Sequence, residues 1–315
     1  MSNLVIDKSL IESIVKNDNQ SYYKKVNDRV SSILTNSIKR LSKQIPYIST
    51  ENVVLQPYNE ILSGAITDNS VFSYLLGVES AQLELNTRKV NTFWRNLKKR
   101  LKFAWANRRK RKSKKNKDVK QDKIDFNSGK YNIYSLTDDL FEAIVLNLCE
   151  TSLISKDDNC LYIVGKDDFG VNAKIKIEVC LYSNENFKFF INKKKGFKEY
   201  NLTCRLNCLN EKILEAGPNF VNMLKIFNVL YFYVNQEHPN AMFLESILYN
   251  VPDKLYEDKS VYDTFLKVVN YLTLKSINNF KSINDISLKL YQDKMFNNQD
   301  QVSYLKMMRI IAEKK

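Results

Sequence analysis

Residues 173–182 read AKIKIEVCLY, and this stretch carries the clearest structural signal in the 315-residue chain. Ile175 and Ile177 alternate with Lys176 and Glu178, so apolar and polar side chains point in opposite directions. Period-two alternation is typical of a β-strand with one buried face. The stretch therefore predicts a sheet strand whose second face carries charged side chains.

Strand-like and helix-like patterns surround this stretch. Residues 52–87, 161–164 and 187–191 have the composition of strands, and the alternation across 200–208 predicts one more strand. Helical spacing is found in four further ranges, 7–45 (with a polar interruption at 17–20), 135–148, 218–274 and 298–313. The combination predicts an α+β fold, a mixed sheet core with a helical N-terminal arm and a helical C-terminal half.

The same patterns suggest a division into three parts. We expect an N-terminal helical arm over 1–48 and an α/β core over 49–210 that contains a basic insertion, 95–129. A helical C-terminal domain would cover 211–315. The chain shows no internal repeat.

The basic charge of the chain is concentrated in one segment. The formal net charge is +14. Residues 95–120 contain fourteen Lys or Arg and one acid, Asp118, so almost the whole excess lies here. The parts on either side are close to neutral. A polyanion is the natural partner of such a segment, because each cation near a phosphate releases condensed counterions.

Two halves of this segment differ in pattern. Trp94, Leu97, Leu101 and Trp105 share one face of an expected helix. A run that is too polar to bury a core follows, and its expected nucleic-acid contacts are Arg108, Arg109, Lys110, Arg111, Lys112, Lys114 and Lys115. Three interpretations stay open: a helix packed through its Trp face ahead of a solubilising loop, a contact to RNA or DNA, and a contact to an anionic membrane surface.

Several classes of protein are excluded by absent residues. His238 is the only histidine, so a catalytic histidine pair and a multi-histidine metal site are excluded. The chain lacks the P-loop, GxGxxG, GxSxG and HExxH motifs. The five cysteines have no CxxC spacing, and we expect reduced thiols in a core. No signal peptide and no apolar run of membrane-spanning length is visible, which favours the cytoplasm.

Carboxylate chemistry remains. Glu178 projects from the polar face of the 173–182 strand, with Lys174 and Lys176 on the same face, and this arrangement suits Mg²⁺ together with substrate phosphates. Glu79 and Glu84 are the candidates in the first half of the chain. The alternative for each is a solvated surface glutamate, which for Glu178 would pair with a neighbouring lysine.

From residue 50 onward the order of elements resembles the DNA polymerase beta-like nucleotidyltransferases, in particular the oligoadenylate-synthetase and bacterial cyclic-oligonucleotide-synthase branch. Residues 63–67, SGAIT, resemble its Gly-Ser turn, and 82–85, QLEL, resemble its paired-acid strand with Gln82 in place of the first acid. Residues 177–179, IEV, resemble the third-acid strand, and 243–248, FLESIL, resemble a helix of the C-terminal half.

The resemblance implies a nucleotide triphosphate substrate and Mg²⁺. Glu84 and Glu178 would bind the metal with Glu79 as a possible third acid, and Ser63, Gly64, Lys174 and Lys176 would contact the nucleotide. Enzymes of this branch make nucleotide second messengers in antiviral defence. Because a neutral amide binds Mg²⁺ poorly, Gln82 leaves it open whether the scaffold is catalytic. One hypothesis is a metal-dependent transferase, and another is an inactive nucleic-acid-binding or regulatory protein on the same scaffold. A third is an adaptor that docks a partner through the apolar face that contains Trp94 and Trp105.

Overall fold

The structure is a computed structural model, and it describes residues 6–16, 20–45, 48, 50–58, 65, 71–79, 83–84, 131–149, 151–157, 160–165, 169, 173–183, 186–192 and 196–314. The two segments of greatest functional interest in the sequence that lie outside these residues are Ser63-Gly64 and the basic segment 95–120. In the described part, no helix combines the length and the apolar character that a membrane span requires.

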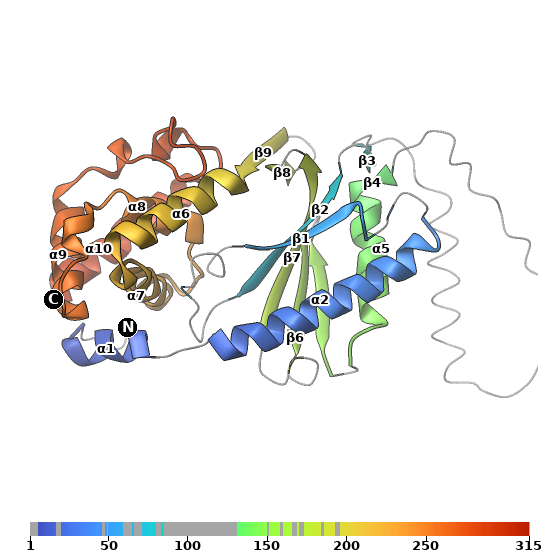
Figure 1. The fold of residues 1–315 in the computed structure, drawn as a ribbon, viewed down its shortest axis with the longest axis horizontal. Helices are drawn as coiled ribbons and strands as arrows, with labels where there is room; N and C mark the ends of the chain where they lie inside the picture. The colour runs from blue at the N-terminus through green and yellow to red at the C-terminus, as the bar shows by residue number, and fades with distance from the viewer. Residues whose placement is uncertain are drawn as a thin grey trace, which may run out of the picture.

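A seven-stranded mixed sheet forms the centre of the molecule (Figure 1). Its strand order is β1-β2-β7-β6-β5, with β8 paired to β7 and β9 paired to β8. β2 and β7 run parallel, and the other pairs are antiparallel. The strands are β1 (Val53–Tyr58), β2 (Phe72–Glu79), β5 (Leu153–Asp157), β6 (Cys160–Gly165), β7 (Ala173–Ser183), β8 (Asn186–Asn192) and β9 (Gly196–Asn201).

One face of the sheet is covered by two helices, α2 (Gln20–Ser42) and α5 (Ile133–Val145). Ile175 and Ile177 of β7 are fully buried in this layer, next to Phe72 and Tyr74 of β2. The strand and the orientation predicted for 173–182 are therefore confirmed. Polar positions of β7 face the other side of the sheet, where a second hydrophobic cluster begins with Leu75 of β2.

The predicted helical N-terminus is confirmed, but its two helices belong to different layers. α1 (Lys8–Lys16) packs against the C-terminal helices through Ile11 and Ile14, whereas α2 packs against the sheet. Within its first 45 residues the chain therefore contributes to both hydrophobic clusters. Figure 1 shows α1 beside the C-terminal helices and α2 along the sheet. The division at residues 48 and 210 stays a prediction.

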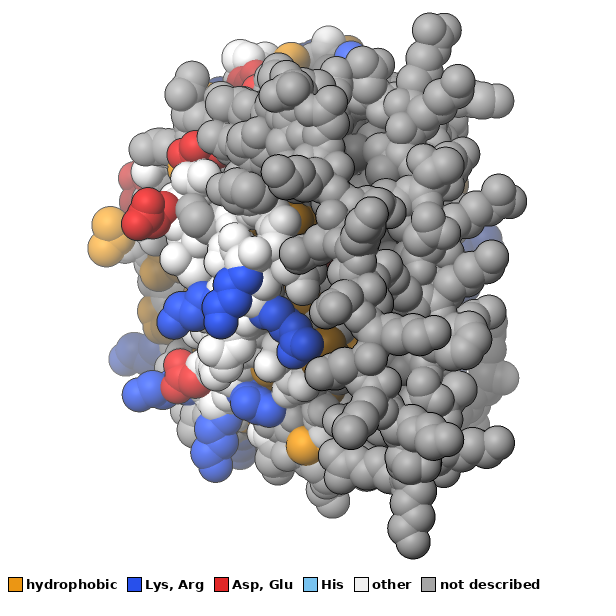
Figure 2. Space-filling model, turned by 90° about the vertical axis from the view of Figure 1, so that its right-hand side faces the viewer, with side chains coloured by type: hydrophobic (Ala, Val, Ile, Leu, Met, Phe, Trp, Pro, Cys, Tyr) orange, Lys and Arg blue, Asp and Glu red, His pale blue; other side chains and the backbone are white. Residues whose placement is uncertain are grey.

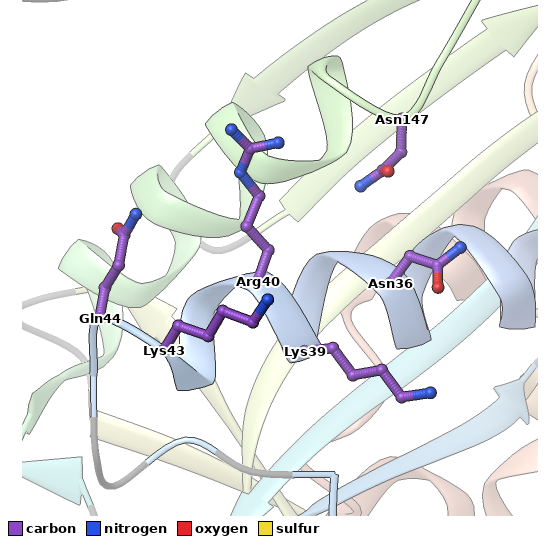
Figure 3. A pocket seen from close by; sticks show the side chains of 6 residues that line it. All are labelled: Asn36, Lys39, Arg40, Lys43, Gln44 and Asn147. Carbon is purple, nitrogen blue, oxygen red and sulfur yellow. The ribbon is translucent and has the colours of Figure 1, made fainter.

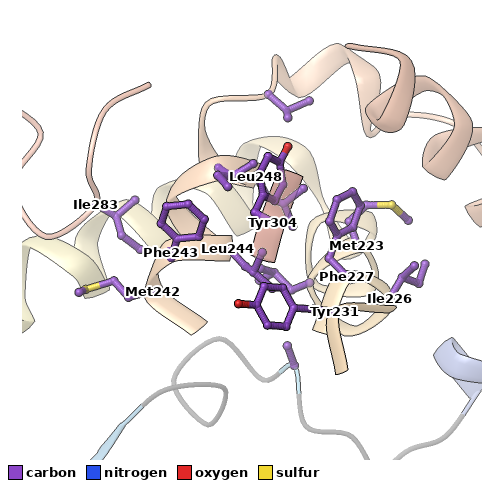
Figure 4. Close-up of a cluster of buried hydrophobic side chains, with 14 of the residues drawn as sticks. Met223, Ile226, Phe227, Tyr231, Met242, Phe243, Leu244, Leu248, Ile283 and Tyr304 are labelled. Carbon is purple, nitrogen blue, oxygen red and sulfur yellow. The ribbon is translucent and has the colours of Figure 1, made fainter. Parts of the chain in front are cut away.

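Helices make up the C-terminal half, as expected. They are α6 (Leu202–Ala216), α7 (Pro218–Asn235), α8 (Ala241–Tyr249), α9 (Val261–Leu274) and α10 (Asn298–Lys314), with short 3-10 helices at Asp253–Leu255, Ile277–Asn279 and Leu290–Gln292. Phe227, Phe243 and Tyr304 come from three different helices and lie in one cluster (Figure 4). Burial of large side chains at this density contributes roughly 1.5–3 kcal/mol for each side chain.

The strand predicted over 200–208 is wrong. β9 ends at Asn201, whose side chain accepts a hydrogen bond from the backbone N–H of Cys204 at 2.9 Å and caps α6. Asparagine at this position stabilises a helix start because it satisfies a free backbone N–H. The buried residues of α6 keep helical spacing, but two of them, Arg205 and Lys212, are charged. Because two of the buried positions are charged, the spacing of apolar residues alone does not predict this helix.

Candidate functional site

The polar face of β7 presents a lysine and a glutamate that pair with each other. Lys176 Nζ lies 3.0 Å from Glu178 Oε2, and the two side chains are 29% and 15% exposed. Burial is the largest single influence on the pKa of Lys176 and would lower it, but the Glu178 carboxylate, with smaller contributions from Cys160 and Tyr162, raises it overall. Lys176 is therefore fully protonated at neutral pH, and its ammonium group balances the Glu178 charge.

Two thiols flank Glu178. Cys160 of β6 is the antiparallel register partner of Glu178, and Cys180 is two residues further along β7. Burial, together with the Glu178 carboxylate, raises the pKa of Cys160 to about 12. The same two causes raise the pKa of Cys180. Both side chains are therefore neutral thiols, which excludes a thiolate nucleophile here because the thiolate is the reactive form.

A buried ion pair connects the C-terminal helices to the sheet. Arg205 of α6 donates to Glu245 of α8 through Nε at 2.7 Å and through Nη2 at 2.8 Å. Arg205 Nη1 also donates to the Tyr200 hydroxyl at 3.2 Å, and the guanidinium lies 5.4 Å from the ring centroid of Tyr58. Burial raises the pKa of Tyr58, to which the Glu178 and Glu245 carboxylates add. The charges of Arg205, Glu245 and Glu178 therefore all act on the Tyr58 hydroxyl.

Arg205 is a residue that sequence reasoning missed. Glu245 belongs to the 243–248 stretch that carries part of the family resemblance, whereas Arg205 lies forty positions earlier. The available signal was that Arg205 is the single charged residue in 200–208, a stretch that otherwise alternates apolar and polar side chains. Buried charges are nearly always paired, so a partner was to be expected.

The strand next to Glu178 carries no acid at the same level. β2 pairs with β7 in parallel, and its residue opposite Glu178 is Leu75, which is fully buried. Ser73 and Gly77 take the neighbouring positions on this side of β2. A side chain at Gly77 is excluded, because a Cβ there would lie 2.7 Å from the Phe187 ring.

Glu79 is four residues beyond Leu75, at the end of β2, and it is opposite Tyr182. At about 3.3 Å per residue, its Cα lies about 13 Å further along the sheet than the Glu178 level. Metal–oxygen bonds of about 2.1 Å do not bridge two glutamates at that spacing. The structure therefore does not bring Glu79 to Glu178.

The remaining predicted site residues are divided between two places. Glu84 belongs to β3 (Leu83–Glu84), which pairs with β4 (Tyr131–Asn132) in a two-stranded sheet separate from that of Glu178. Lys174 is exposed on β7. Burial lowers the pKa of His238, and the charge of Lys174 lowers it further. Ser63, Gly64 and the expected nucleic-acid contacts from Arg108 to Lys115 lie outside the described residues.

The described side chains do not fit a two-metal centre. Such a centre holds two cations about 3.5–4 Å apart and needs several carboxylates around them. Over the part of the chain that the structure describes, no three His, Cys, Asp or Glu side chains are grouped to bind a metal ion. Glu178 is a single carboxylate, and an ammonium group already contacts it.

The C-terminal half matches a known protein family. Residues 228–313 match the family described as the cGAS/DncV-like nucleotidyltransferase C-terminal helical domain. Among curated proteins, none is significantly similar to the chain.

Solved structures are similar over almost the whole chain. The CdnE cyclic dinucleotide synthase of Elizabethkingia meningoseptica shares 13% identity at a TM-score of 0.61, over 98% of each chain. The CdnE c-UMP-AMP synthase of Rhodothermus marinus shares 15% identity at 0.59, over 98% of this chain and 97% of that one. CdnC of E. coli MS115-1 shares 11% identity at 0.58, over 98% and 91%. The chain therefore has the fold of these nucleotidyltransferase structures, and its residues 228–313 match the C-terminal helical domain of the cGAS/DncV-like family, in agreement with the resemblance seen in the sequence.

Proposed function

We propose that this chain is a regulatory protein on a nucleotidyltransferase scaffold, which binds a nucleotide on the polar face of β7 and does not carry out two-metal phosphoryl transfer. The observation that carries the proposal is the environment of Glu178. Its neighbour on β2 is Leu75, and its charge is balanced by Lys176. A single compensated carboxylate cannot hold two cations against a triphosphate.

Lys176 offers a different way to bind phosphate. An ammonium group is a compact cation with three donors, and it contacts phosphate oxygens without a metal. Lys174 is exposed two residues away on the same strand face, so it adds a second cation. Nucleotide phosphates would then bind to protein cations, and Glu178 would hold Lys176 in place.

The similar structures support a nucleotide as the ligand. The Elizabethkingia meningoseptica enzyme was solved with GTP and Apcpp, and the E. coli MS115-1 CdnC was solved with ATP. We infer that this chain binds a purine nucleoside triphosphate in the corresponding part of the fold. The basic segment 95–120 would bind RNA or DNA as a second, separate partner.

The same comparisons favour a second candidate function. Several similar structures are cyclic dinucleotide synthases, and the match covers almost the whole chain. Under this alternative the chain is a metal-dependent synthase of a nucleotide second messenger in bacterial antiviral defence. Glu84 would then join Glu178 at Mg²⁺, and Ser63 and Gly64 would contact the nucleotide.

One set of measurements separates the two functions. The full chain is incubated with each labelled nucleoside triphosphate, with Mg²⁺, with Mn²⁺ and with a chelator, and both bound nucleotide and product are measured. We expect binding in the chelator and no product with either metal. Lys176→Gln should weaken binding at least tenfold, whereas the control Lys267→Gln on α9 should leave it unchanged. Product that disappears in Glu178→Gln would establish the synthase instead.

A further inference from the structure

A polar hollow lies on the opposite side of the sheet from Lys176, between the end of α2 and the residues that follow α5. Its volume is about 480 Å³. Three cations and three amides line it: Asn36, Lys39, Arg40, Lys43, Gln44 and Asn147. Figure 3 shows that these side chains come from α2, the turn after it and the segment after α5, and that Lys39 and Arg40 extend in different directions from α2. A hollow of this size accommodates a small ligand.

In the part of the chain that the structure describes, no salt bridge pairs a cation of this hollow with an acid, although Arg40 also lines a neighbouring cavity with Asp139 and Glu142. Within the described residues, Lys39, Arg40 and Lys43 take part in none of the salt bridges, whereas Lys156 and Lys176 each do. Lysine and arginine side chains also gather on the face of the molecule at which α2 ends (Figure 2). Like charges one helix turn apart destabilise a helix by about 0.2–0.5 kcal/mol per pair. The clustered cations therefore lower the stability of the helix end, and no salt bridge among the described residues offsets this loss.

Helix capping does not account for the cluster either. Cations in the last turn of a helix compensate its dipole, which corresponds to about half a negative charge. A single lysine is enough for that purpose. The end of α2 and the residue after it carry three cations, Lys39, Arg40 and Lys43. Their summed charge is about six times the partial charge of the helix end, so most of it remains available to a ligand.

One wall of the hollow is rigid. The Asn147 side-chain nitrogen donates to Ser37 Oγ at 3.0 Å and to the Ala143 carbonyl at 2.9 Å. Ser37 is fully buried and donates in turn to the Ile33 carbonyl at 2.8 Å. These bonds fix α2 against α5. The cations therefore extend from a preorganised frame, which lowers the entropic cost of binding.

The lining is suited to a phosphate monoester. Arginine pairs with two phosphate oxygens at once, and lysine adds point charges. A terminal phosphate carries a charge of about −1.5 to −2 at neutral pH, which three cations match better than they match the single charge of a phosphodiester. The amides of Asn36 and Gln44 supply further donors.

We propose that this hollow is a second ligand site, separate from the face of β7, and that it binds the terminal phosphate of a nucleotide or of an oligonucleotide 5′ end. The two sources share the phosphate monoester. They differ in whether a chain of further nucleotides is required for binding.

The test compares two otherwise identical single-stranded 12-nucleotide DNAs, one with a 5′-phosphate and one with a 5′-hydroxyl, each labelled at its 3′ end. Fluorescence polarisation measures their binding to the full chain at pH 7.5. We expect the phosphorylated strand to bind at least tenfold more tightly. The comparison cancels contacts to the internal backbone, including any made by the basic segment 95–120.

Variants assign the preference to the hollow. Arg40→Gln with Lys43→Gln should reduce the tenfold preference to less than twofold, while the matched surface change Arg309→Gln on α10 should leave it intact. Thermal unfolding checks that all variants are folded. Equal binding of the two strands, or a preference that survives the double change, would overturn the proposal. AMP added as a competitor decides the source: displacement of the strand assigns a free nucleotide, and its absence assigns an oligonucleotide end.

Discussion

Leu75 lies directly opposite Glu178 in the parallel pairing of β2 and β7. The pairing places a buried apolar side chain at the position from which a second carboxylate would reach a cation shared with Glu178. Lys176 supplies the only contact to the Glu178 carboxylate among the described salt bridges. The negative charge of Glu178 is therefore balanced by the Lys176 ammonium group. The interaction energy of this pair can be measured.

The Lys176–Glu178 pair should show a small favourable coupling. Because both side chains retain contact with water, we expect a double-mutant cycle of Lys176→Gln and Glu178→Gln to give about 1 kcal/mol or less. Urea unfolding of the four proteins measures the coupling. If the pair is only structural, the coupling energy should be the same with and without Mg²⁺. If Glu178 binds a metal ion, Mg²⁺ should raise the stability of the unmodified protein and not that of Glu178→Gln.

Nucleic-acid binding should depend on the basic segment. Replacing the nine Lys and Arg of 107–120 by Ser keeps the length of the chain and removes most of its excess charge. We expect most of the affinity for a 20-nucleotide RNA to be lost at low salt, and the slope of log K against log salt to flatten. Unchanged binding by the substituted protein would mean that the segment is a solubilising linker.

Local periodicity was enough to predict much of the fold. The alternation in 173–182 gave β7 and its buried face, because one side of the strand meets α2 and α5. The helical spacing in 7–45, with its interruption, gave α1 and α2. These features depend on neighbouring residues, which a single sequence displays directly.

Long-range relationships could not be read in this way. Residues 71–76 have a β-like pattern, but nothing in the sequence says that this strand rather than 82–85 lies beside Glu178. The ion pair of Arg205 and Glu245 joins positions forty residues apart. Pairings of this kind are set by the packing of whole layers, and a single sequence contains no record of them.

His238 offers a direct test of the contact between β7 and the C-terminal half. Burial lowers its pKa, and the Lys174 ammonium lowers it further. Because the folded protein holds the neutral imidazole, this residue stabilises the fold above pH 6.5, and the contribution is lost as the pH falls through the lowered pKa. His238→Gln should therefore flatten the pH dependence of unfolding below pH 6.5.

Lys174→Gln should raise the pKa of His238 towards its ordinary value by removing the nearby positive charge. Because His238 is the only histidine, its imidazole proton signals in an NMR titration are unambiguous. The matched change Lys156→Gln on β5 should leave the titration unchanged. A pKa that does not move in Lys174→Gln would mean that Lys174 does not approach the C-terminal half in solution.

The two arginine–glutamate pairs of the C-terminal half should differ sharply in energy. Arg205 and Glu245 are fully buried, whereas Arg309 and Glu313 are exposed on α10. Arg205→Ala leaves a buried carboxylate without its partner, and we expect a loss of about 3–5 kcal/mol in the free energy of unfolding. Arg309→Ala should cost below about 0.5 kcal/mol, because water solvates both charges. Urea unfolding measures both.

The large loss in Arg205→Ala would come from the unpaired Glu245 charge and not only from lost packing. A double change, Arg205→Met with Glu245→Leu, removes both charges and keeps most of the buried volume, so it should recover at least half of the lost stability. If the double variant is as unstable as Arg205→Ala, the guanidinium contributes mainly through its contacts with Tyr58 and Tyr200. In that case, Tyr200→Phe should lower stability as well, because it removes the hydroxyl that accepts from Arg205.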